Sequence, residues 1–260
     1  MSDCLKGEID MCGRFTLSTP AGELIRMFLT LDFPEQPPRD NICPTQLVIC
    51  VRRDPKQEPT RQAVLMRWGL VPFWAKDLSI GSRMINARSE TVAEKPSFRR
   101  AFRSQRCLIP ADGFYEWQAI TDMASEATTD ESSVAAEAST KRRPRKKKPV
   151  KQKWWIHLPD RRPFAFAGLW ESWRPQRPKN SETGAGDFEN SSDADDSPEV
   201  LTCSILTTAA NAEMSSVHDR MPVILTPDQH ELWLSDKASS AQLTSVMHSL
   251  PDGSLELTRC

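Results

Sequence analysis

The sequence predicts an α+β fold, with an antiparallel, barrel-like β-sheet core, short flanking helices and two disordered insertions in a single domain. Apolar segments of strand length outnumber segments with helical spacing. Two polar stretches, 118–152 and 174–199, have the composition of disordered segments. They dilute the chain to 38% hydrophobic residues, although its 260 residues suffice for one large domain.

Each expected element follows from a local pattern of apolar residues. Strands are expected at 12–18, 47–51, 63–71, 106–111, 113–117, 154–158, 164–170 and 200–208. The two strands within 106–117 are expected to meet in a turn at Asp112 and Gly113. Helical spacing occurs at 20–31, 96–105, 227–234 and 238–248. Many short strands with few helices favour an antiparallel sheet.

The domain boundaries follow the same pattern. Residues 1–11 are polar and are expected to be a leader or the product of a misassigned start. The domain is expected to span 12–235, and 236–260 to form a helix and tail of the same domain. Residues 141–153 carry nine basic side chains. That block is either a solvated loop or an auxiliary arm that binds phosphates.

Several classes of protein are disfavoured. The net charge of −1 gives no overall attraction to nucleic acid or membrane. The seven cysteines are odd in number and include no CxxC pair, so neither a disulfide framework nor a zinc site is indicated, and no metal or cofactor is expected. The sequence has neither a long apolar run nor a secretory signal, so a cytoplasmic protein is expected.

Reactive side chains are concentrated in short segments that also contain tryptophan, arginine or proline. Taken singly, each has an ordinary structural explanation, since a lone cysteine is usually a buried apolar residue. Together, and in this order, they resemble the motifs of the SRAP family, the SOS-response-associated peptidases or abasic-site processing proteins. The motifs are MCGRF (11–15), NICPTQ (41–46), MRWGLVPFWAKD (66–77), INARSET (85–91), RCLIPADGFYEW (106–117), AFAGLWE (165–171) and VHDRMPVIL (217–225).

The resemblance implies a covalent reaction with single-stranded DNA that has lost a base. In this family a cysteine becomes the first residue and offers an α-amine and a thiol to the aldehyde of the opened sugar. The amine forms an imine, and the thiol then closes a thiazolidine ring. An α-amine, with an unperturbed pKa of about 7.7–8.0, is partly neutral at pH 7. An internal Cys12 lacks this amine.

The matching motifs also imply roles for individual residues. Cys12 would be the nucleophile, Glu116 the general acid and base, His218 an aid to proton transfer, and Asn86 the residue that fixes the geometry. The residues implied to bind DNA are Arg14, Arg88, Arg220, Pro44, Trp68 and Trp74. The arginines would hold flanking phosphates, and the others would form an apolar or stacking surface. The resemblance further implies a monomer, at the nucleoid during DNA damage if the organism is prokaryotic.

One departure from the family pattern concerns the N-terminus. Cys12 follows eleven residues, whereas the family pattern has cysteine directly after the initiator methionine. Three explanations are open: Met11 is the true start, the chain cleaves its own Met11–Cys12 bond, or the leader stays and no crosslink forms.

Three functions are compatible with these residues. The first is a covalent sensor and shield of abasic sites, with possible lyase character. The second is a thiol-dependent peptidase that acts on its own leader or on another protein. The third is a non-covalent binder of single-stranded DNA in which Cys12 is inert.

Overall fold

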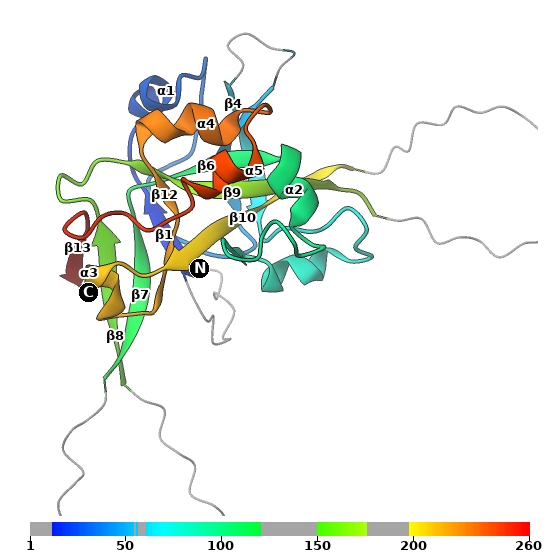
Figure 1. The fold of residues 1–260 in the computed structure, drawn as a ribbon. Coiled ribbons are helices and arrows are strands. Elements are labelled where there is room, and N and C mark those ends of the chain that lie inside the picture. The colour runs from blue at the N-terminus through cyan, green and yellow to red at the C-terminus, as the bar shows by residue number, and fades with distance from the viewer. Residues whose placement is uncertain (1–11, 55, 57–60, 121–149, 176–197) are drawn as a thin grey trace, which may run out of the picture.

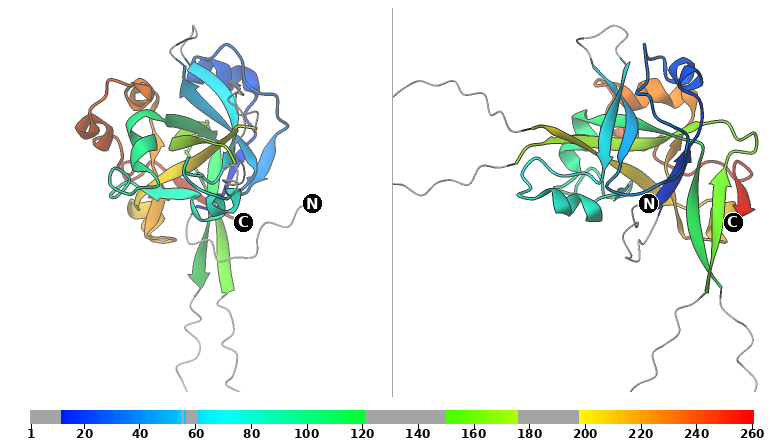
Figure 2. Two further views of the ribbon diagram at one scale, coloured as in Figure 1. Left: turned by 90° about the vertical axis from the view of Figure 1, so that its right-hand side faces the viewer. Right: turned by 180° about the vertical axis from the view of Figure 1, so that it is seen from behind.

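The structure, a computed structural model, describes residues 12–54, 56, 61–120, 150–175 and 198–260 (Figure 1). Within these ranges the chain folds around two β-sheets with short helices outside them, as the further views in Figure 2 show. The predicted α+β class with a barrel-like sheet is confirmed. The expected leader and most of both expected insertions lie outside the described residues.

Five strands of the larger sheet close into a barrel. Each pairs with two neighbours in the cyclic order β3, β4, β10, β9, β6 and back to β3. The strands are β3 (Leu47–Arg53), β4 (Arg61–Trp68), β6 (Arg106–Ala111), β9 (Phe164–Trp173) and β10 (Val200–Ala209). Closure gives every strand of the ring two partners, which makes the barrel a rigid support for the chain around it.

Three short strands extend this sheet. They are β5 (Asn86–Arg88), β11 (Arg220–Pro222) and β12 (Ile224–Leu225). Strands β5 and β11 both pair with β10, and β12 pairs with β9. The prediction of an antiparallel sheet needs one correction, because β10 runs parallel to both β4 and β5.

The smaller sheet has the strand order β13, β8, β7, β1, β2 and is antiparallel throughout. Its strands are β1 (Arg14–Leu17), β2 (Arg39–Ile42), β7 (Gly113–Ile120), β8 (Val150–His157) and β13 (Glu256–Arg259). Strands β7 and β8 form a long ribbon that projects from the body (Figures 1 and 2). The prediction of disorder over 118–152 is wrong at both ends, because pairing continues as far as Ile120 opposite Val150.

The predicted turn at Asp112 and Gly113 is a corner between the two sheets. Strand β6 ends at Ala111 in the larger sheet, and β7 begins at Gly113 in the smaller one. The two strands therefore do not pair as a hairpin. The carboxylate of Asp112 fastens the corner to the end of β1, because it accepts hydrogen bonds from the backbone N–H groups of Ser18 and Thr19.

Aromatic side chains join the two sheets. The ring of Phe166 in β9 lies edge-on to Phe15 of β1, at 5.7 Å between centroids, and to Phe114 of β7, at 6.1 Å. Phe15 also contacts Trp68 of β4 at 5.2 Å. All four rings are buried, and burying one such side chain contributes about 1.5–3 kcal/mol. This packing holds β1 and β7 in place against the barrel.

Helices lie outside the sheets. They are α1 (Ala21–Phe28), α2 (Arg99–Ser104), α3 (Ala212–Ser215), α4 (His230–Leu234), α5 (Ser240–Thr244) and the 3₁₀ segments η1 (Leu78–Arg83) and η2 (Pro227–Gln229). Helix α1 packs on α4 through the stacked rings of Phe28 and His230. None of the helices in the described ranges combines the length and apolar composition that crossing a bilayer requires.

Candidate active site

Cys12 lies two residues before β1, against the middle of β7. Strands β1 and β7 are antiparallel with Arg14 opposite Tyr115, so the residues before Arg14 follow the line of β7. The side chain of Cys12 is buried, with 1% of its surface exposed. Its backbone N–H donates a hydrogen bond of 2.6 Å to Oε1 of Glu116. The structure therefore brings together the first two predicted catalytic residues.

Glu116 is a buried carboxyl group on β7. It is 5% exposed and lies on the same face of the strand as the buried ring of Phe114. Burial raises its pKa to about 7, and the hydrogen bonds from the backbone N–H groups of Cys12 and Trp117 oppose that rise. A carboxyl group with a pKa near neutrality can both accept and donate a proton at physiological pH.

The thiol of Cys12 experiences the same environment. Burial raises its pKa well above the usual value, and the nearby charge of Glu116 raises it further. The sulfur is therefore held as a neutral thiol at physiological pH. Attack by this sulfur requires a group that takes its proton, and Glu116 is the buried acid hydrogen-bonded to the same residue.

Asn86 reaches the same residue from the larger sheet. It is the first residue of β5, which pairs in parallel with β10 so that Asn86 lies opposite Ile205. Its Nδ2 donates to the backbone carbonyl of Cys12 at 3.4 Å. Cys12 is thus held by β7 through its N–H and by β5 through its carbonyl group.

His218 lies on the loop between α3 and β11. This loop is fastened to β7 by a hydrogen bond of 2.7 Å from Nε2 of Gln118 to the carbonyl of Ser216. Gln118 lies two residues beyond Glu116 and on the same face of the strand. The loop of His218 is therefore tied to β7 at Gln118. Among the described residues, the polar contacts of His218 itself are with Asp219 and Arg220 and not with the other three predicted catalytic residues.

The hydrogen bonds of His218 determine which ring nitrogen carries a proton. Nδ1 accepts a bond of 3.0 Å from the backbone N–H of Arg220, so a neutral ring carries its proton on Nε2. A carboxylate oxygen of Asp219 lies 2.9 Å from the same Nδ1. The ring of His218 is thus positioned by its own loop.

The three predicted phosphate-binding arginines have different surroundings. Arg88 is exposed at the end of β5. The guanidinium of Arg14 lies 5.2 Å from the ring centroid of Trp117, on the face of β7 opposite Glu116. Arg220 forms two bonds with the carboxylate of Glu90, at 2.5 and 2.9 Å.

Of the predicted stacking residues, only Trp74 is exposed, at 44%. Trp68 is completely buried, and its Nε1 donates to the carbonyl of Ile85 at 2.9 Å. Pro44 is also buried. The prediction that Trp68 and Pro44 form a base-stacking surface therefore does not fit their positions. Trp68 closes the barrel core instead.

Comparison with known proteins identifies the family. The sequence profile described as SOS response associated peptidase (SRAP) matches residues 11–260. The chain belongs to the SRAP family. It is 37% identical over 230 residues to the abasic site processing protein YoqW of Bacillus subtilis, a match that covers 87% of this chain and 81% of YoqW. YoaM of the same organism is 36% identical, with 88% and 82% covered.

More distant relatives extend the comparison to vertebrates and to solved structures. The abasic site processing protein HMCES of Gallus gallus is 29% identical over 65% of this chain and 44% of its own. A crystal structure from Bacteroides thetaiotaomicron shares the fold with a TM-score of 0.70 and 22% identity, covering 95% of this chain and 91% of that one. A second, from Bordetella bronchiseptica, has a TM-score of 0.67 and 21% identity, with 96% and 99% covered.

Two residues of this SRAP domain become candidates only in the structure. Phe73 is 50% exposed beside Trp74, and the guanidinium of Arg100 lies 4.4 Å from its ring centroid. Glu90 supports Arg220, whose N–H holds the ring of His218. Phe73 and Glu90 lie inside the motifs at 66–77 and 85–91, so their position close to Trp74 and Arg88 in the sequence could have suggested them.

Within the described ranges, no cluster of three metal-ligating side chains occurs.

Proposed function

We propose that this protein forms a covalent link with abasic sites in single-stranded DNA through Cys12 when Cys12 is the first residue of the chain. The proposal is carried by the hydrogen bond of 2.6 Å between the backbone nitrogen of Cys12 and Glu116. That bond puts the future α-amine beside a buried carboxyl group with a pKa of about 7. The names of the relatives, abasic site processing proteins, support the choice of substrate.

The chemistry needs no external reagent. The α-amine adds to the aldehyde carbon of the opened sugar, and loss of water leaves an imine. The thiol then adds to the imine carbon, and its proton moves to the nitrogen, which closes the five-membered thiazolidine. Glu116 is suited to take the proton of the α-ammonium group first and later to return it to the departing hydroxyl.

The neighbouring residues have supporting roles in this scheme. Asn86 fixes the carbonyl of Cys12, which orients the amine and the thiol on one side of the residue. His218, with Nε2–H available in its neutral form, donates to the sugar oxygen as the ring opens. Holding both nucleophiles in position lowers the entropic cost of two successive bond-forming steps.

Removal of the leader is part of the proposal. Either translation starts at Met11, or the bond between Met11 and Cys12 is cut. For cutting within the chain, water would add to the carbonyl carbon of Met11, and protonated Glu116 would donate to the nitrogen of Cys12 as the C–N bond breaks. The products are a carboxylate on Met11 and a free α-amine on Cys12. The family name, which describes a peptidase, supports this second activity.

The DNA would cross the surface that contains the exposed side chains near the site. Arg88 and Arg14 are suited to hold phosphates, and Trp74 with Phe73 offers exposed rings for stacking. A single strand fits this surface because stacking on the side chains requires unpaired bases. We further propose that the protein acts as a monomer in the cytoplasm, at the nucleoid during DNA damage in a prokaryote.

A crosslinking assay with two cysteine variants tests the proposal. The chain expressed from Met11 is incubated with an abasic 15-mer and resolved under denaturing conditions. Cys12→Ala should abolish the covalent band, and Cys203→Ala, which removes a free thiol from β10 in the barrel, should leave it intact. A band that persists in Cys12→Ala would refute the assignment of the nucleophile.

Replacement of the thiol separates the two bond-forming steps. Cys12→Ser keeps the α-amine, so it should still form an imine that cyanoborohydride reduces to a stable link. Without ring closure by sulfur, the unreduced imine should also eliminate the 3′ phosphate and cut the strand. Strand cutting that is equal in wild type and Cys12→Ser would contradict a protective role for the thiazolidine.

A further inference from the structure

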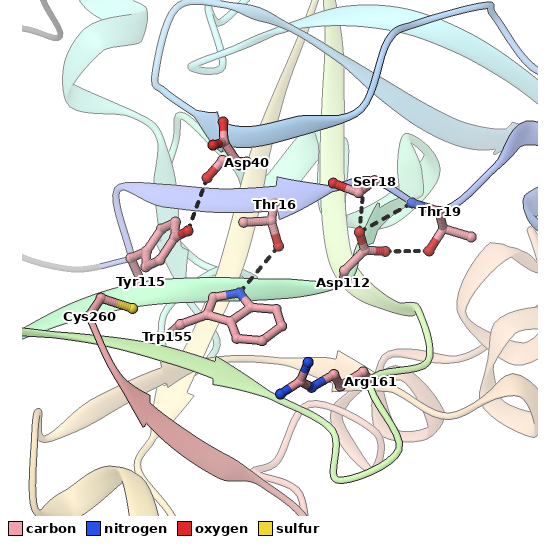
Figure 3. Close-up of a pocket in the computed structure, with 9 residues that line it drawn as sticks. All are labelled: Thr16, Ser18, Thr19, Asp40, Asp112, Tyr115, Trp155, Arg161 and Cys260. Carbon is pink, nitrogen blue, oxygen red and sulfur yellow. Dashed lines mark hydrogen bonds between the residues drawn. The ribbon is translucent and has the colours of Figure 1, made fainter.

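A pocket of about 520 Å³ opens on the outer face of the smaller sheet, away from Glu116 (Figure 3). Tyr115 and Trp155 contribute aromatic walls, and Arg161 contributes a cation. Tyr115 precedes Glu116 in β7, so their side chains point to opposite faces of the sheet. The pocket and the candidate active site therefore share one strand and lie back to back.

The indole ring of Trp155 is held firmly in this pocket. It lies over Gly113, where a Cβ atom would come within 2.7 Å of its Cε2 and 2.8 Å of the carbonyl of Ile156. Its Nε1 donates to Oγ1 of Thr16 at 3.3 Å, and the ring of His157 packs beside it at 4.1 Å. The ring is thus fixed in advance in a partly exposed position that lines the pocket.

Cations lie beside the aromatic rings on this face. Nζ of Lys153 lies 3.7 Å from the centroid of Tyr115, and the guanidinium of Arg161 lies 5.8 Å from that of Trp155. Neither cation makes an ion pair among the described residues. Arg161 has a φ of 55°, which is uncommon outside glycine, and closes a turn with the carbonyl of Leu158. Figure 3 shows its guanidinium turned toward Trp155.

Strand β1 links this surface to the candidate active site along the chain. On β1, the chain runs from Cys12 past Arg14, whose guanidinium lies over Trp117, to Thr16 in the pocket. Four residues of extended strand span about 13 Å. That distance corresponds to a few nucleotides of a single strand.

We propose that the pocket binds a nucleotide of the same DNA strand, a few positions from the abasic site. Its base stacks on Trp155 and Tyr115, and its phosphate contacts Arg161 and Lys153. Alternation of aromatic rings with unpaired cations is the pattern by which proteins bind single strands without reading their sequence. This inference rests on the proposed function, because it assumes that the strand is already held at Cys12.

Two carboxyl side chains also line the pocket, together with Cys260, and they limit where a phosphate can lie. The carboxylate of Asp112 is occupied by Ser18 and Thr19, whose backbone N–H groups donate to it. Asp40 is exposed, and its backbone carbonyl accepts the hydroxyl of Tyr115 at 3.1 Å. The carboxylate of Asp112 is thus already satisfied by the protein, and the phosphate is assigned to the cations Arg161 and Lys153.

Non-covalent binding to oligonucleotides tests the inference without the chemistry of Cys12. The probes carry a reduced abasic site without an aldehyde, so that no crosslink forms. One is a 5-mer, and two 15-mers are extended on only the 5′ or only the 3′ side of the lesion. Affinity is measured by fluorescence anisotropy at one fixed salt concentration, because binding to phosphates depends on salt.

Two variants remove the pocket, and a third serves as their control. Arg161→Gly removes the cation and suits the left-handed φ at that position. Trp155→Leu removes the stacking surface. Arg162→Ala removes an equal charge from the next residue, whose guanidinium pairs with Asp160 outside the proposed contact.

The expected result is a loss of affinity of about fivefold or more in Arg161→Gly and Trp155→Leu for one of the two 15-mers. Affinity for the 5-mer should stay unchanged, and Arg162→Ala should resemble wild type with all three probes. The inference is overturned if Arg161→Gly binds both 15-mers as tightly as Arg162→Ala does. If millimolar free dAMP competes with the 15-mers for wild type but not for Arg161→Gly, that result would overturn the inference and assign the pocket to free nucleotides.

Failure of this inference is distinguishable from failure of the proposed function. If wild type crosslinks to an aldehyde-bearing 15-mer and the pocket variants do not change affinity, the proposed function is retained and the pocket inference is rejected. Variants that weaken binding in a chain that never crosslinks would leave a non-covalent DNA binder with this pocket.

Discussion

The backbone N–H of Cys12 donates to a carboxyl oxygen of Glu116 at 2.6 Å, inside a site where both residues are buried. This contact joins the backbone nitrogen of Cys12 to a carboxyl group whose pKa burial raises to about 7. In the proposed reaction, the nucleophile and its proton acceptor would therefore be positioned before any DNA binds. That arrangement leads to several measurable consequences.

The first concerns the stability of the chain that retains its leader. The pKa of Glu116 is about 7 in the folded state, above its ordinary value of about 4.3, so folding favours the protonated form. Its contribution is fully present below about pH 4.3 and is lost as pH rises through 7. Glu116→Gln should therefore gain stability relative to wild type between pH 5 and pH 8, by up to about 3 kcal/mol.

Urea unfolding at the two pH values measures this difference. Glu23→Gln, at an exposed position in α1, is the control and should show a much smaller change with pH. Equal behaviour of the two variants would mean that Glu116 is not desolvated in the folded protein.

A second prediction concerns Glu90, which holds Arg220 through two short bonds. The backbone N–H of Arg220 in turn holds Nδ1 of His218. Glu90→Gln should slow crosslinking, by up to about a hundredfold if the ring of His218 shifts by about 1 Å. Single-turnover rates measure the effect, and the dissociation constant for DNA should change less than twofold.

The control is Glu94→Gln, which removes an equal charge from a nearby exposed position. If Glu90→Gln tightens DNA binding without slowing the reaction, Arg220 is released to bind phosphate, and its support of His218 is unimportant.

A third prediction tests the corner that carries Trp155. Gly113→Ala would place a methyl group within 2.8 Å of the backbone carbonyl of Ile156 and closer still to the indole nitrogen. Because the backbone of Ile156 is fixed by the sheet and cannot shift easily, we expect the free energy of unfolding to fall by about 1–3 kcal/mol, as measured by thermal or urea unfolding.

Gly22→Ala is the matched control for this change. Gly22 lies in α1, where a Cβ atom would meet only the end of Arg26 at 3.9 Å. This variant should be as stable as wild type or gain about 0.5–1 kcal/mol, since alanine favours a helix. Unchanged stability in Gly113→Ala would show that Trp155 does not lie over that position.

A fourth prediction concerns acid sensitivity away from the site. His230 is buried against Phe28, and burial followed by the charge of Arg61 lowers its pKa to about 4. Since its unfolded pKa is about 6.5, its neutral form is favoured by folding, and this stability is lost as pH falls from about 6.5 to 4. His230→Phe should reduce the loss of stability over that interval by up to about 3 kcal/mol.

Thermal unfolding at pH 7 and pH 4.5 distinguishes wild type from this variant. His248→Phe, a change at an exposed histidine in the same part of the chain, should leave the acid response unchanged. If wild type and His230→Phe lose the same stability between pH 7 and pH 4.5, protonation of His230 does not cause the acid sensitivity.

Much of the fold was predictable because most core strands carry continuous apolar runs. The segment at 47–53 is an example, since its middle residues are completely buried. Strand β13 was not predictable, because ELTR lacks an apolar pattern and forms a strand only by pairing with β8. The three residues of β5 are likewise too few to form a pattern and depend on pairing with β10.

The candidate site divides in a similar way. Cys12, Glu116 and Asn86 were found from motifs, and hydrogen bonds join them in the structure. The run at 68–74 could not tell Trp68 from Trp74, because only the closed barrel buries one and leaves the other exposed. Gly113 was predicted to form a turn, whereas its lack of a side chain instead makes room for an indole from another strand.

The central claim is that Cys12 reacts because it is the first residue, and intact-mass spectrometry tests this most directly. Two chains are compared after incubation with an abasic 15-mer: one that begins at Cys12 and one in which a single alanine precedes Cys12. The account predicts that the first gains the mass of the DNA less one water and that the second gains nothing. An equal adduct on both chains would contradict the account, because a blocked amine cannot form the ring.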